Sequence, residues 1–353
     1  MMGAEEPAGG LTLPKSALKW VAVGLLLSTS VVVIISILSG VSFADLARLG
    51  YLPFGLAAAV GAARLLVQVV RFRVLVTGLA RDPRPDLGGL ALARGGSEFV
   101  SLSTPATSMG VFIRTAWLTG KGVDGGTALW IGYFEVLMEI YVAGSLALIA
   151  AAIAFLKGAV VIGTTILVIT IILVSGYTTF FVIPALRNIK IPHRLFSIAS
   201  FLIGGPRATA LYLRAVVGSL NFSLSARAIL NRNNMPVVVK AVGLTIIEDL
   251  LAGTALWVVL TSAGLKIDPF STTFVVYGAV AIQALIPISI GGAGITELTT
   301  QAYLTAVYGF SSWPAVVLWR VATYQVLLAI TGVVFFIYAR KATRQGSKTQ
   351  KKT

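Results

Sequence analysis

The chain has 353 residues, of which 57% are hydrophobic and only 12% are charged, and its mean hydropathy is +0.90. One soluble core cannot hide that much apolar surface, so the composition predicts an all-α polytopic membrane protein. The lack of cysteine excludes disulfides and thiolate metal sites, and a single histidine excludes a histidine metal cluster or a serine–histidine–acid triad. We expect no metal and no cofactor.

The formal net charge of +15 is unevenly distributed along the chain. Lys and Arg residues gather in three segments, 71–94, 187–240 and 340–352. By the positive-inside rule these segments lie in the cytoplasm, which places both termini on the cytoplasmic side of the cell membrane. We attribute the excess charge to this topology and to anionic lipid headgroups, and we do not expect nucleic acid as a partner.

Six apolar segments are long enough to cross the hydrocarbon core, which takes about 20 residues. They lie at 17–39, 51–73, 127–155, 159–183, 236–262 and 311–340. The first follows basic residues, as the core of a secretory signal does. Its apolar core is longer than the roughly 7–15 residues of a signal, so we interpret it as a retained helix.

Three polar or basic segments complete the predicted single transmembrane domain, 1–353. Residues 1–16 are expected to form a cytoplasmic N-terminal segment. Residues 184–235 carry seven Lys and Arg residues and no acidic residue, and their apolar clusters alternate with arginines. This pattern is typical of a basic amphipathic connector on the inner leaflet. The polar, basic residues 341–353 are predicted to form a disordered cytoplasmic tail.

Two further apolar segments, 87–119 and 270–309, are each broken by proline and glycine. In each, the proline precedes the glycine by five residues: Pro105 and Gly110 in the first, Pro287 and Gly292 in the second. Proline stops a helix, and glycine admits backbone shapes that other residues resist. In a bilayer, broken backbone survives only where protein or a water-lined cavity satisfies it. Each segment is therefore predicted to form either a re-entrant hairpin or two short, tilted helices. The first alternative gives about six spanning helices plus two re-entrant hairpins, and the second gives eight or more transmembrane helices.

The charge asymmetry places the ends of the first broken segment in the cytoplasm and those of the second outside. The two breaks would then enter the membrane from opposite faces. An inverted repeat with its site near the middle of the membrane has this arrangement. The alternative is that the match between the two breaks arises by chance in a glycine-rich chain.

Seven charged residues lie in or beside the predicted membrane segments: Arg114, Glu135, Glu139, Glu248, Asp249, Glu297 and Arg320. Each costs roughly 2.5–3.5 kcal/mol at a helix centre, so we expect them to face inward, to pair or to lie near an interface.

Spacing suggests how these charges pair. Glu135 and Glu139 are one helical turn apart and repel each other unless a cation or a proton intervenes. Arg114 and Arg320 are the expected partners of these acids, and one of the two is also expected to pair with Glu297. Glu248 and its neighbour Asp249 point about 100° apart, so only one of them need join the same cluster. Arg64, nearer a span end, is expected to extend to the interface and has no role in this scheme.

Four motifs carry a resemblance to a known family: TP-x4-G-x3-R at 104–114, GYFEVLMEIY at 132–141, P-x3-GG-x-G-x2-E at 287–297 and WRVATYQVLLAITG at 319–332. Over about residues 50–340 the chain resembles the lysylphosphatidylglycerol synthase transmembrane family, a flippase-like module that is also fused to lipid-modifying enzymes. It departs from the family pattern at Ala106, Val111, Val136 and Glu139. The aminoacyl-transferring domain of the fused enzymes is absent, so we do not expect a complete lipid-lysinylating enzyme.

The resemblance and the intramembrane charges together predict a membrane lipid transporter, flippase- or scramblase-like, and no enzymatic activity. It would move a charged-headgroup phospholipid or a polyisoprenyl-phosphate lipid between leaflets. The predicted lipid-binding and transport residues are Thr104, Pro105, Gly110, Arg114, Glu135, Glu139, Glu248, Pro287, Gly291, Gly292, Gly294, Glu297 and Arg320.

The expected partners are membrane lipids with anionic or phosphate-bearing headgroups, with a homo-oligomer or a lipid-modifying enzyme as further possibilities. Two other functions stay open. In the first, the chain is a non-catalytic membrane subunit that partners a synthase or glycosyltransferase. In the second, it is an intramembrane enzyme that acts on a lipid phosphate. The enzyme would depend on Glu248 and Asp249, the only adjacent acidic pair in the membrane segments.

Overall fold

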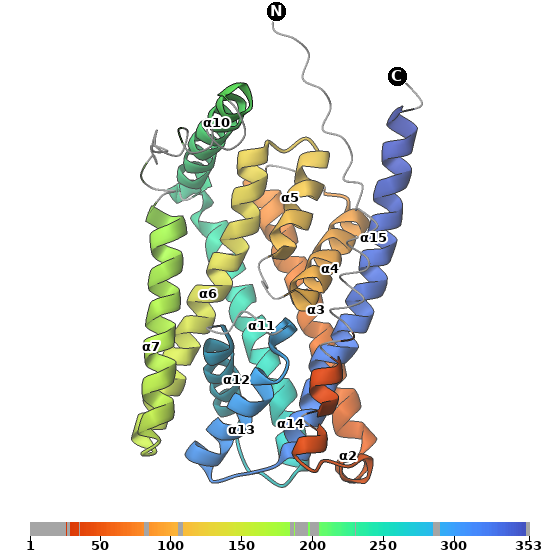
Figure 1. Ribbon diagram of the computed structural model, residues 1–353, viewed down its shortest axis with the longest axis vertical. Helices are drawn as coiled ribbons and strands as arrows, with labels where there is room; N and C mark the ends of the chain where they lie inside the picture. Colours follow the sequence, from red (N-terminus) through yellow and green to blue (C-terminus); the bar gives the residue numbers. More distant parts are fainter. Residues whose placement is uncertain are drawn as a thin grey trace, which may run out of the picture.

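The computed structural model describes most of the chain. The described residues are 26, 29–34, 36–80, 85–104, 109–183, 187, 197, 205–229, 231–284 and 290–350. Every element that these residues form is a helix, which confirms the predicted all-α membrane fold. Figure 1 shows most of the helices running lengthwise, side by side, in one bundle.

Among the described residues, five helical segments are long and apolar enough to cross a membrane, and each coincides with a predicted span. They are α3 (Tyr51–Leu79), α6 (Gly125–Leu156), α7 (Val160–Tyr177) continued by η2 (Thr178–Val182), α11 (Met235–Ser262) preceded by η3 (Arg232–Asn234), and the run of α14 (Trp313–Arg320), η5 (Val321–Gln325) and α15 (Val326–Gln350). A helix pairs its own backbone groups, which is the condition for crossing hydrocarbon.

Most of the first predicted span, 17–39, lies outside the described residues. The described helix Thr29–Leu38 is bent by 94° from α2 (Phe43–Leu49). At the bend, Gly40 has a φ of 69°, and the Ser42 side chain caps the first turn of α2. The two helices amount to a sixth span only if they are taken together as one broken span.

The first broken segment forms two helices that pack side by side, α4 (Leu87–Ser103) and α5 (Gly110–Gly120). Pro105 lies outside the described residues. Gly110 begins α5 where the two helices are closest, because a Cβ there would lie 2.4 Å from the backbone oxygen of Ser97. The Ser97 hydroxyl donates to the Gly110 carbonyl at 2.8 Å. The glycine of this motif thus permits the helix contact that closes the hairpin.

The second broken segment has the same organisation, with α12 (Pro269–Ala284), the short turn η4 (Ile290–Gly292) and α13 (Ile295–Tyr308). Pro287 lies outside the described residues. The three glycines of the motif all have a positive φ, the region of backbone conformation that favours glycine; they are Gly291 at 57°, Gly292 at 74° and Gly294 at 90°. The glycines therefore shape the turn that reverses the chain direction.

The two hairpins occupy opposite halves of the bundle. In Figure 1, α4 and α5 lie in the half next to α10 (Gly205–Ile229), whereas α12 and α13 lie in the half next to α2. α5 has 11 residues and α13 has 14, so at 1.5 Å per residue neither reaches across about 30 Å of hydrocarbon. Each segment is thus a re-entrant hairpin in form, and the two enter from opposite ends, as predicted.

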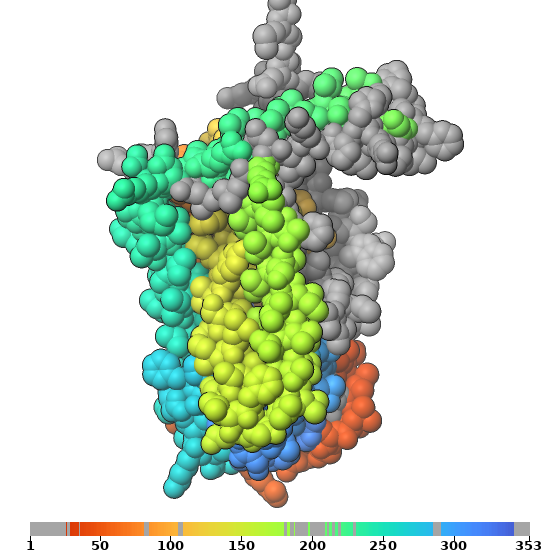
Figure 2. Space-filling model, turned by 90° about the vertical axis from the view of Figure 1, so that its left-hand side faces the viewer, coloured from red at the N-terminus to blue at the C-terminus, as the bar shows by residue number. Residues whose placement is uncertain are grey.

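The connector helix α10 lies across one end of the bundle in Figure 2, where it is drawn in green to teal. It rests on the first turns of α6. The ring of Phe222 meets Trp130 edge-on, with centroids 4.9 Å apart, and the hydroxyls of Thr127 and Ser225 are 3.1 Å apart. A helix in this position is suited to the membrane surface. Most of residues 184–204 of the connector lie outside the described residues, and its place on the inner leaflet stays a prediction.

The last helix is longer than predicted. α15 continues to Gln350, so it reaches into the segment 341–353 that the sequence predicted to be a disordered tail. Ala, Arg, Gln and Lys dominate its final turns, and all four have high helix propensity, which offsets their polarity. Net polarity is therefore a poor guide to where this helix ends.

The span α11 and the hairpin helix α12 approach closely at a glycine. A Cβ on Gly253 would lie 1.9 Å from the hydroxyl oxygen of Thr273 and 2.5 Å from its Cα. Small residues permit such contacts between membrane helices, whose association depends on close van der Waals packing. The second hairpin is therefore held against the bundle by backbone proximity at this point.

Gly253→Ala should lower the thermal stability of the purified protein, because overpacking of this kind costs about 1–3 kcal/mol. Gly243→Ala is the control on the same helix, since a Cβ at Gly243 meets no atom within 4 Å. It should leave the melting temperature unchanged or raise it, because alanine favours a helix over glycine by about 1 kcal/mol. Equal melting temperatures for the two variants, measured in one detergent, would contradict this packing.

Candidate functional site

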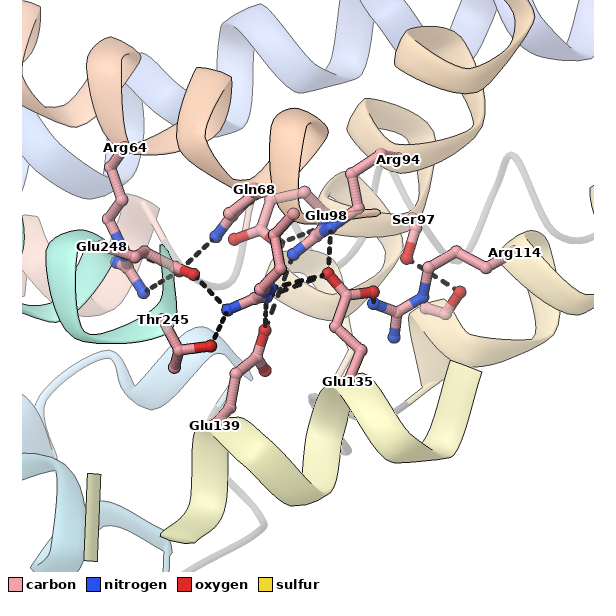
Figure 3. A network of polar contacts seen from close by, with 12 residues as sticks. Arg64, Gln68, Arg94, Ser97, Glu98, Arg114, Glu135, Glu139, Thr245 and Glu248 are labelled. Carbon is pink, nitrogen blue, oxygen red and sulfur yellow. Dashed lines mark hydrogen bonds and ion pairs between the residues drawn. The ribbon is translucent and has the colours of Figure 1, made fainter. Parts of the chain in front are cut away.

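Arg71, on α3, lies at the centre of a buried network of charges. Its side chain is 0% exposed, and its guanidinium contacts three carboxylates. Nη2 lies 2.9 Å from Glu135 Oε1 and also bonds Glu139, both on α6. Nη1 lies 2.6 Å from Glu248 Oε2 and 3.1 Å from the Thr245 hydroxyl, both on α11. This one side chain therefore ties three long helices together, and Figure 3 shows the network.

Glu135 receives further arginines from the first hairpin. Arg94, on α4, places its Nε 3.2 Å from Glu135 Oε1 and its Nη1 2.9 Å from Glu98 Oε2. Arg114, on α5, donates to the other oxygen of Glu135. The carboxylate of Glu135 is thus shared by arginines from α3, α4 and α5. Its contact with Arg114 is one that the sequence predicted.

Two further polar residues on the same face of α3, Arg64 and Gln68, also contact α11. Arg64 was expected to extend to the membrane interface, and this was wrong. Its Nε and Nη2 both lie 3.1 Å from Glu248 Oε1, and the amide of Gln68 donates to the same oxygen at 2.6 Å. Arg64 pairs with the buried Glu248 and does not extend to water at the interface, because Glu248 without a partner would be a costly unpaired buried charge.

A separate charge pair closes the second break. Arg320 Nε lies 3.1 Å from Glu297 Oε1, which is one of the two pairings predicted for this glutamate. Glu297 Oε2 accepts from the backbone N–H of Gly294 at 2.8 Å, and Arg320 also donates to the Gly291 carbonyl. Arg320 does not join Glu135 and Glu139, as the sequence had also allowed, because it is used to hold the glycine turn.

Tyr324 connects the two breaks. It lies in the π-helical turn η5, and the Arg320 guanidinium lies 4.1 Å from the centre of its ring. Its hydroxyl donates to the carbonyl of Leu102 at 2.8 Å, in the last turn of α4 before the first break. A Cβ on Gly291 would lie 2.0 Å from the same hydroxyl. Both reversals of the chain therefore meet on one side chain of a spanning helix.

Beside the charge network lies a cavity of about 450 Å³ that is lined by both charged and aliphatic side chains. Its charged residues come from α3, α4, α5, α6 and α11, and they are Arg64, Arg94, Glu98, Arg114, Glu139, Glu248 and Asp249. Its aliphatic residues on α6, α7 and α12 are Ile140, Ala143, Ala147, Leu173, Val174, Val280 and Ala281, and α7 and α12 also contribute the polar residues Thr170, Tyr177, Tyr277 and Gln283. A cavity of this kind suits an amphipathic molecule, which has both a charged group and hydrocarbon.

The structure places the predicted site residues in different parts of the bundle. Three line the cavity: Arg114, Glu139 and Glu248. Glu135 is buried behind the cavity wall, and Gly110, Gly291, Gly292, Gly294, Glu297 and Arg320 belong to the two breaks. Thr104 ends α4, and its hydroxyl bonds the Val100 carbonyl of its own helix. Pro105 and Pro287 lie outside the described residues. The sequence thus found the breaks and the acids, but only part of the cavity wall.

Sequence reasoning missed Arg71, Arg94, Glu98 and Gln68. Arg71 and Arg94 were counted with the cytoplasmic basic residues, because they lie near the ends of apolar segments. Spacing could have found them. Arg64, Gln68 and Arg71 recur at i, i+4 and i+7, which puts them on one face of a helix, and Arg94 and Glu98 form an i, i+4 ion pair. Both Glu248 and Asp249 line the cavity, although their spacing required only one to do so.

Comparison with known proteins agrees with the four motifs. The family model described as the lysylphosphatidylglycerol synthase TM region matches residues 21–331. The chain belongs to this family. No curated protein matches it. The matched region runs from the start of the described helices to α15, so the charge network, both hairpins and the cavity all lie within the lysylphosphatidylglycerol synthase TM region.

Arg71→Met should lower the thermal stability strongly, because it leaves three carboxylates without their shared cation. Breaking a buried ion pair on one side costs about 3–5 kcal/mol. Arg71→Lys should also be destabilising, since a single ammonium cannot reproduce the planar fork that meets several carboxylates. Arg73→Met is the matched control, because Arg73 is exposed on the same helix. If the Arg71 and Arg73 variants melt at the same temperature, the network does not hold the bundle together.

Proposed function

We propose that this protein is a membrane lipid transporter, flippase- or scramblase-like, that moves a phospholipid or polyisoprenyl-phosphate lipid with a charged headgroup between leaflets. One observation carries the proposal. The cavity of about 450 Å³ is lined by arginines and carboxylates together with aliphatic side chains. A lipid is the membrane component that needs both surfaces at once.

Arg114 is the residue best suited to meet a headgroup phosphate. Its Nη1 is bound to Glu135, but its Nε has no hydrogen-bond partner among the residues that the structure describes. Arg114 lines the cavity and lies in the first turns of α5, whose N-terminus favours an anion. A guanidinium donor and a helix N-terminus together match the charge and geometry of a phosphate.

The two hairpins supply a route from both faces of the membrane. They enter from opposite ends of the bundle (Figure 1) and meet at Tyr324. Inverted hairpins around a central polar site are typical of transport proteins that open to one side and then to the other. We propose that the end bearing α10 faces the cytoplasm, because the basic residues gather there.

We propose no catalysis for this site. An intramembrane enzyme would need the acidic pair Glu248 and Asp249, but Glu248 is bound by Arg64, Gln68 and Arg71. Both oxygens of Glu248 are therefore engaged by side chains of α3, which leaves this carboxylate poorly placed to meet a substrate. The proposed partners are therefore lipids, together with a lipid-modifying enzyme that would supply them.

Lipid movement can be measured in liposomes that carry a fluorescent phospholipid and are treated with a membrane-impermeant quencher. Wild-type protein should expose lipid from both leaflets, whereas protein-free liposomes should lose only the outer-leaflet signal. Gly292→Leu should abolish the movement, because residue 292 has a φ of 74° and its Cβ would lie 2.1 Å from Gln283 Cδ. If wild-type protein moves no lipid, the proposal fails and a non-catalytic partner subunit becomes the better interpretation.

A second variant tests the headgroup contact. Arg114→Lys keeps a cation for Glu135 but loses the planar guanidinium, whose separate nitrogens can bind Glu135 and a phosphate at the same time, so it should slow lipid movement by about tenfold or more, given that a hydrogen bond to a charged group contributes about 1.5–3 kcal/mol. Arg73→Lys is the control at an exposed position of α3. Equal rates for the two lysine variants, with equal amounts of folded protein, would argue against the role of Arg114.

The proposed orientation predicts a labelling pattern in this cysteine-free chain. Cysteines at Ser42 and Ser271 should react with impermeant maleimide from outside intact cells, because α2 and the start of α12 lie at the end away from α10 (Figure 1). Cysteines at Ser197 and Ser347 should react only after the membrane is opened. The reverse labelling pattern would show that the end bearing α10 faces the outside, which contradicts the proposed orientation.

A further inference from the structure

The charges around the cavity do not balance, and one residue accounts for the difference. Four arginines take part, Arg64, Arg71, Arg94 and Arg114, with five acids, Glu98, Glu135, Glu139, Glu248 and Asp249. Four positive and five negative charges leave a formal charge of −1. Each glutamate contacts an arginine within 4 Å, whereas Asp249 contacts none among the described residues.

Among the described residues, Asp249 instead has one hydrogen-bond partner, and this partner is neutral. The hydroxyl of Tyr277, on α12, donates to its Oδ1, and its Oδ2 is buried without a hydrogen-bond partner among the residues that the structure describes. The residue is 4% exposed and lines the cavity. An ionised carboxylate in that position is an uncompensated buried charge, so a further negative charge that enters the cavity favours its protonation.

Among the described residues, the helices packed against α11 offer Asp249 no free cation. On α3, Arg64 directs both Nε and Nη2 to Glu248, and Gln68 is neutral. On α14, Arg320 is bound to Glu297. The remaining titratable groups that line the cavity near it are Glu139 on α6, Glu248 on α11 itself and Tyr277 on α12. All of these are acids, so none of them can neutralise Asp249.

We propose that Asp249 is a proton-binding site and that a proton and an anionic headgroup bind the cavity together. A proton passes from water to Oδ2 while Tyr277 keeps its hydrogen bond to Oδ1, and it returns to water when the lipid leaves. The network changes from −1 to neutral in this step, which removes the repulsion that the network would exert on a phosphate. By linkage, proton and lipid raise each other's affinity by the same factor. The proposal rests on the lipid-binding function above and adds the ion coupled to it.

Proton uptake on lipid binding tests this directly. Full-length protein in weakly buffered detergent, with a soluble pH indicator, would be titrated with a short-chain phosphatidylglycerol, and binding would be measured in parallel by calorimetry. Wild-type protein should take up about one proton per bound lipid, as expected when binding is linked to one titrating site. Asp249→Asn should bind the lipid with no uptake and with an affinity that does not change with pH.

Two further variants keep the test decisive. Asp268→Asn is the control, because Asp268 is an exposed cap of α12 and asparagine caps a helix equally well; its uptake should equal that of the wild type. Tyr277→Phe keeps the carboxylate but removes the hydroxyl that donates to it, so uptake should occur at higher pH. Lipid that binds wild-type protein without proton uptake, or with equal uptake in the Asp249→Asn variant, overturns this proposal alone. Failure of the wild type to bind lipid at all overturns the proposed function.

Discussion

The requirement that buried charges be neutralised within the membrane governs this structure. Arg71 meets it for three carboxylates at once, and its position fixes where α3, α6 and α11 cross. Arg94 and Arg114 then attach the first hairpin to the same point through Glu135. Each of these charges would be costly alone in hydrocarbon, and together they form a compact unit that opens onto the cavity. The stability of the helix bundle and the charged lining of the cavity therefore depend on the same group of side chains.

The second requirement is that the backbone groups left unpaired at the two breaks find hydrogen-bond partners. In the described part of the fold, side chains of one spanning helix supply them. Tyr324 and Arg320, on successive turns of α14 and η5, bond carbonyls of Leu102 and Gly291 beside the two breaks. A π-helical turn at this place follows the general tendency of such turns to occur where function needs an altered side-chain direction. The two hairpins are thus connected to each other through one spanning helix, which contacts both of them.

The sequence predicted the fold well because its strongest signals are local. Apolar length marked five spans, and Pro105, Gly110, Pro287 and Gly292 marked both hairpins. The site was harder, because partners lie far apart in the chain: Arg71 is 64 residues from Glu135 and 177 from Glu248. An arginine near the end of an apolar segment looks the same whether it reaches water or a buried acid. Only packing decides between these, which is why Arg64 was misassigned and Glu297 could be given two candidate partners.

The sequence separation within the Arg71 network bears on how the protein is made. Ribosomes deliver α3 to the membrane long before α6, and α6 long before α11, whose Glu248 completes the set. An early intermediate therefore contains Arg71, Arg94 and Arg114 with too few acids to neutralise them. Until α6 supplies Glu135 and Glu139, these helices carry charges that hydrocarbon disfavours. Insertion of the early helices into lipid is thereby tied to synthesis of α6, and the second half of the chain adds Glu248 to a network that has already begun to form.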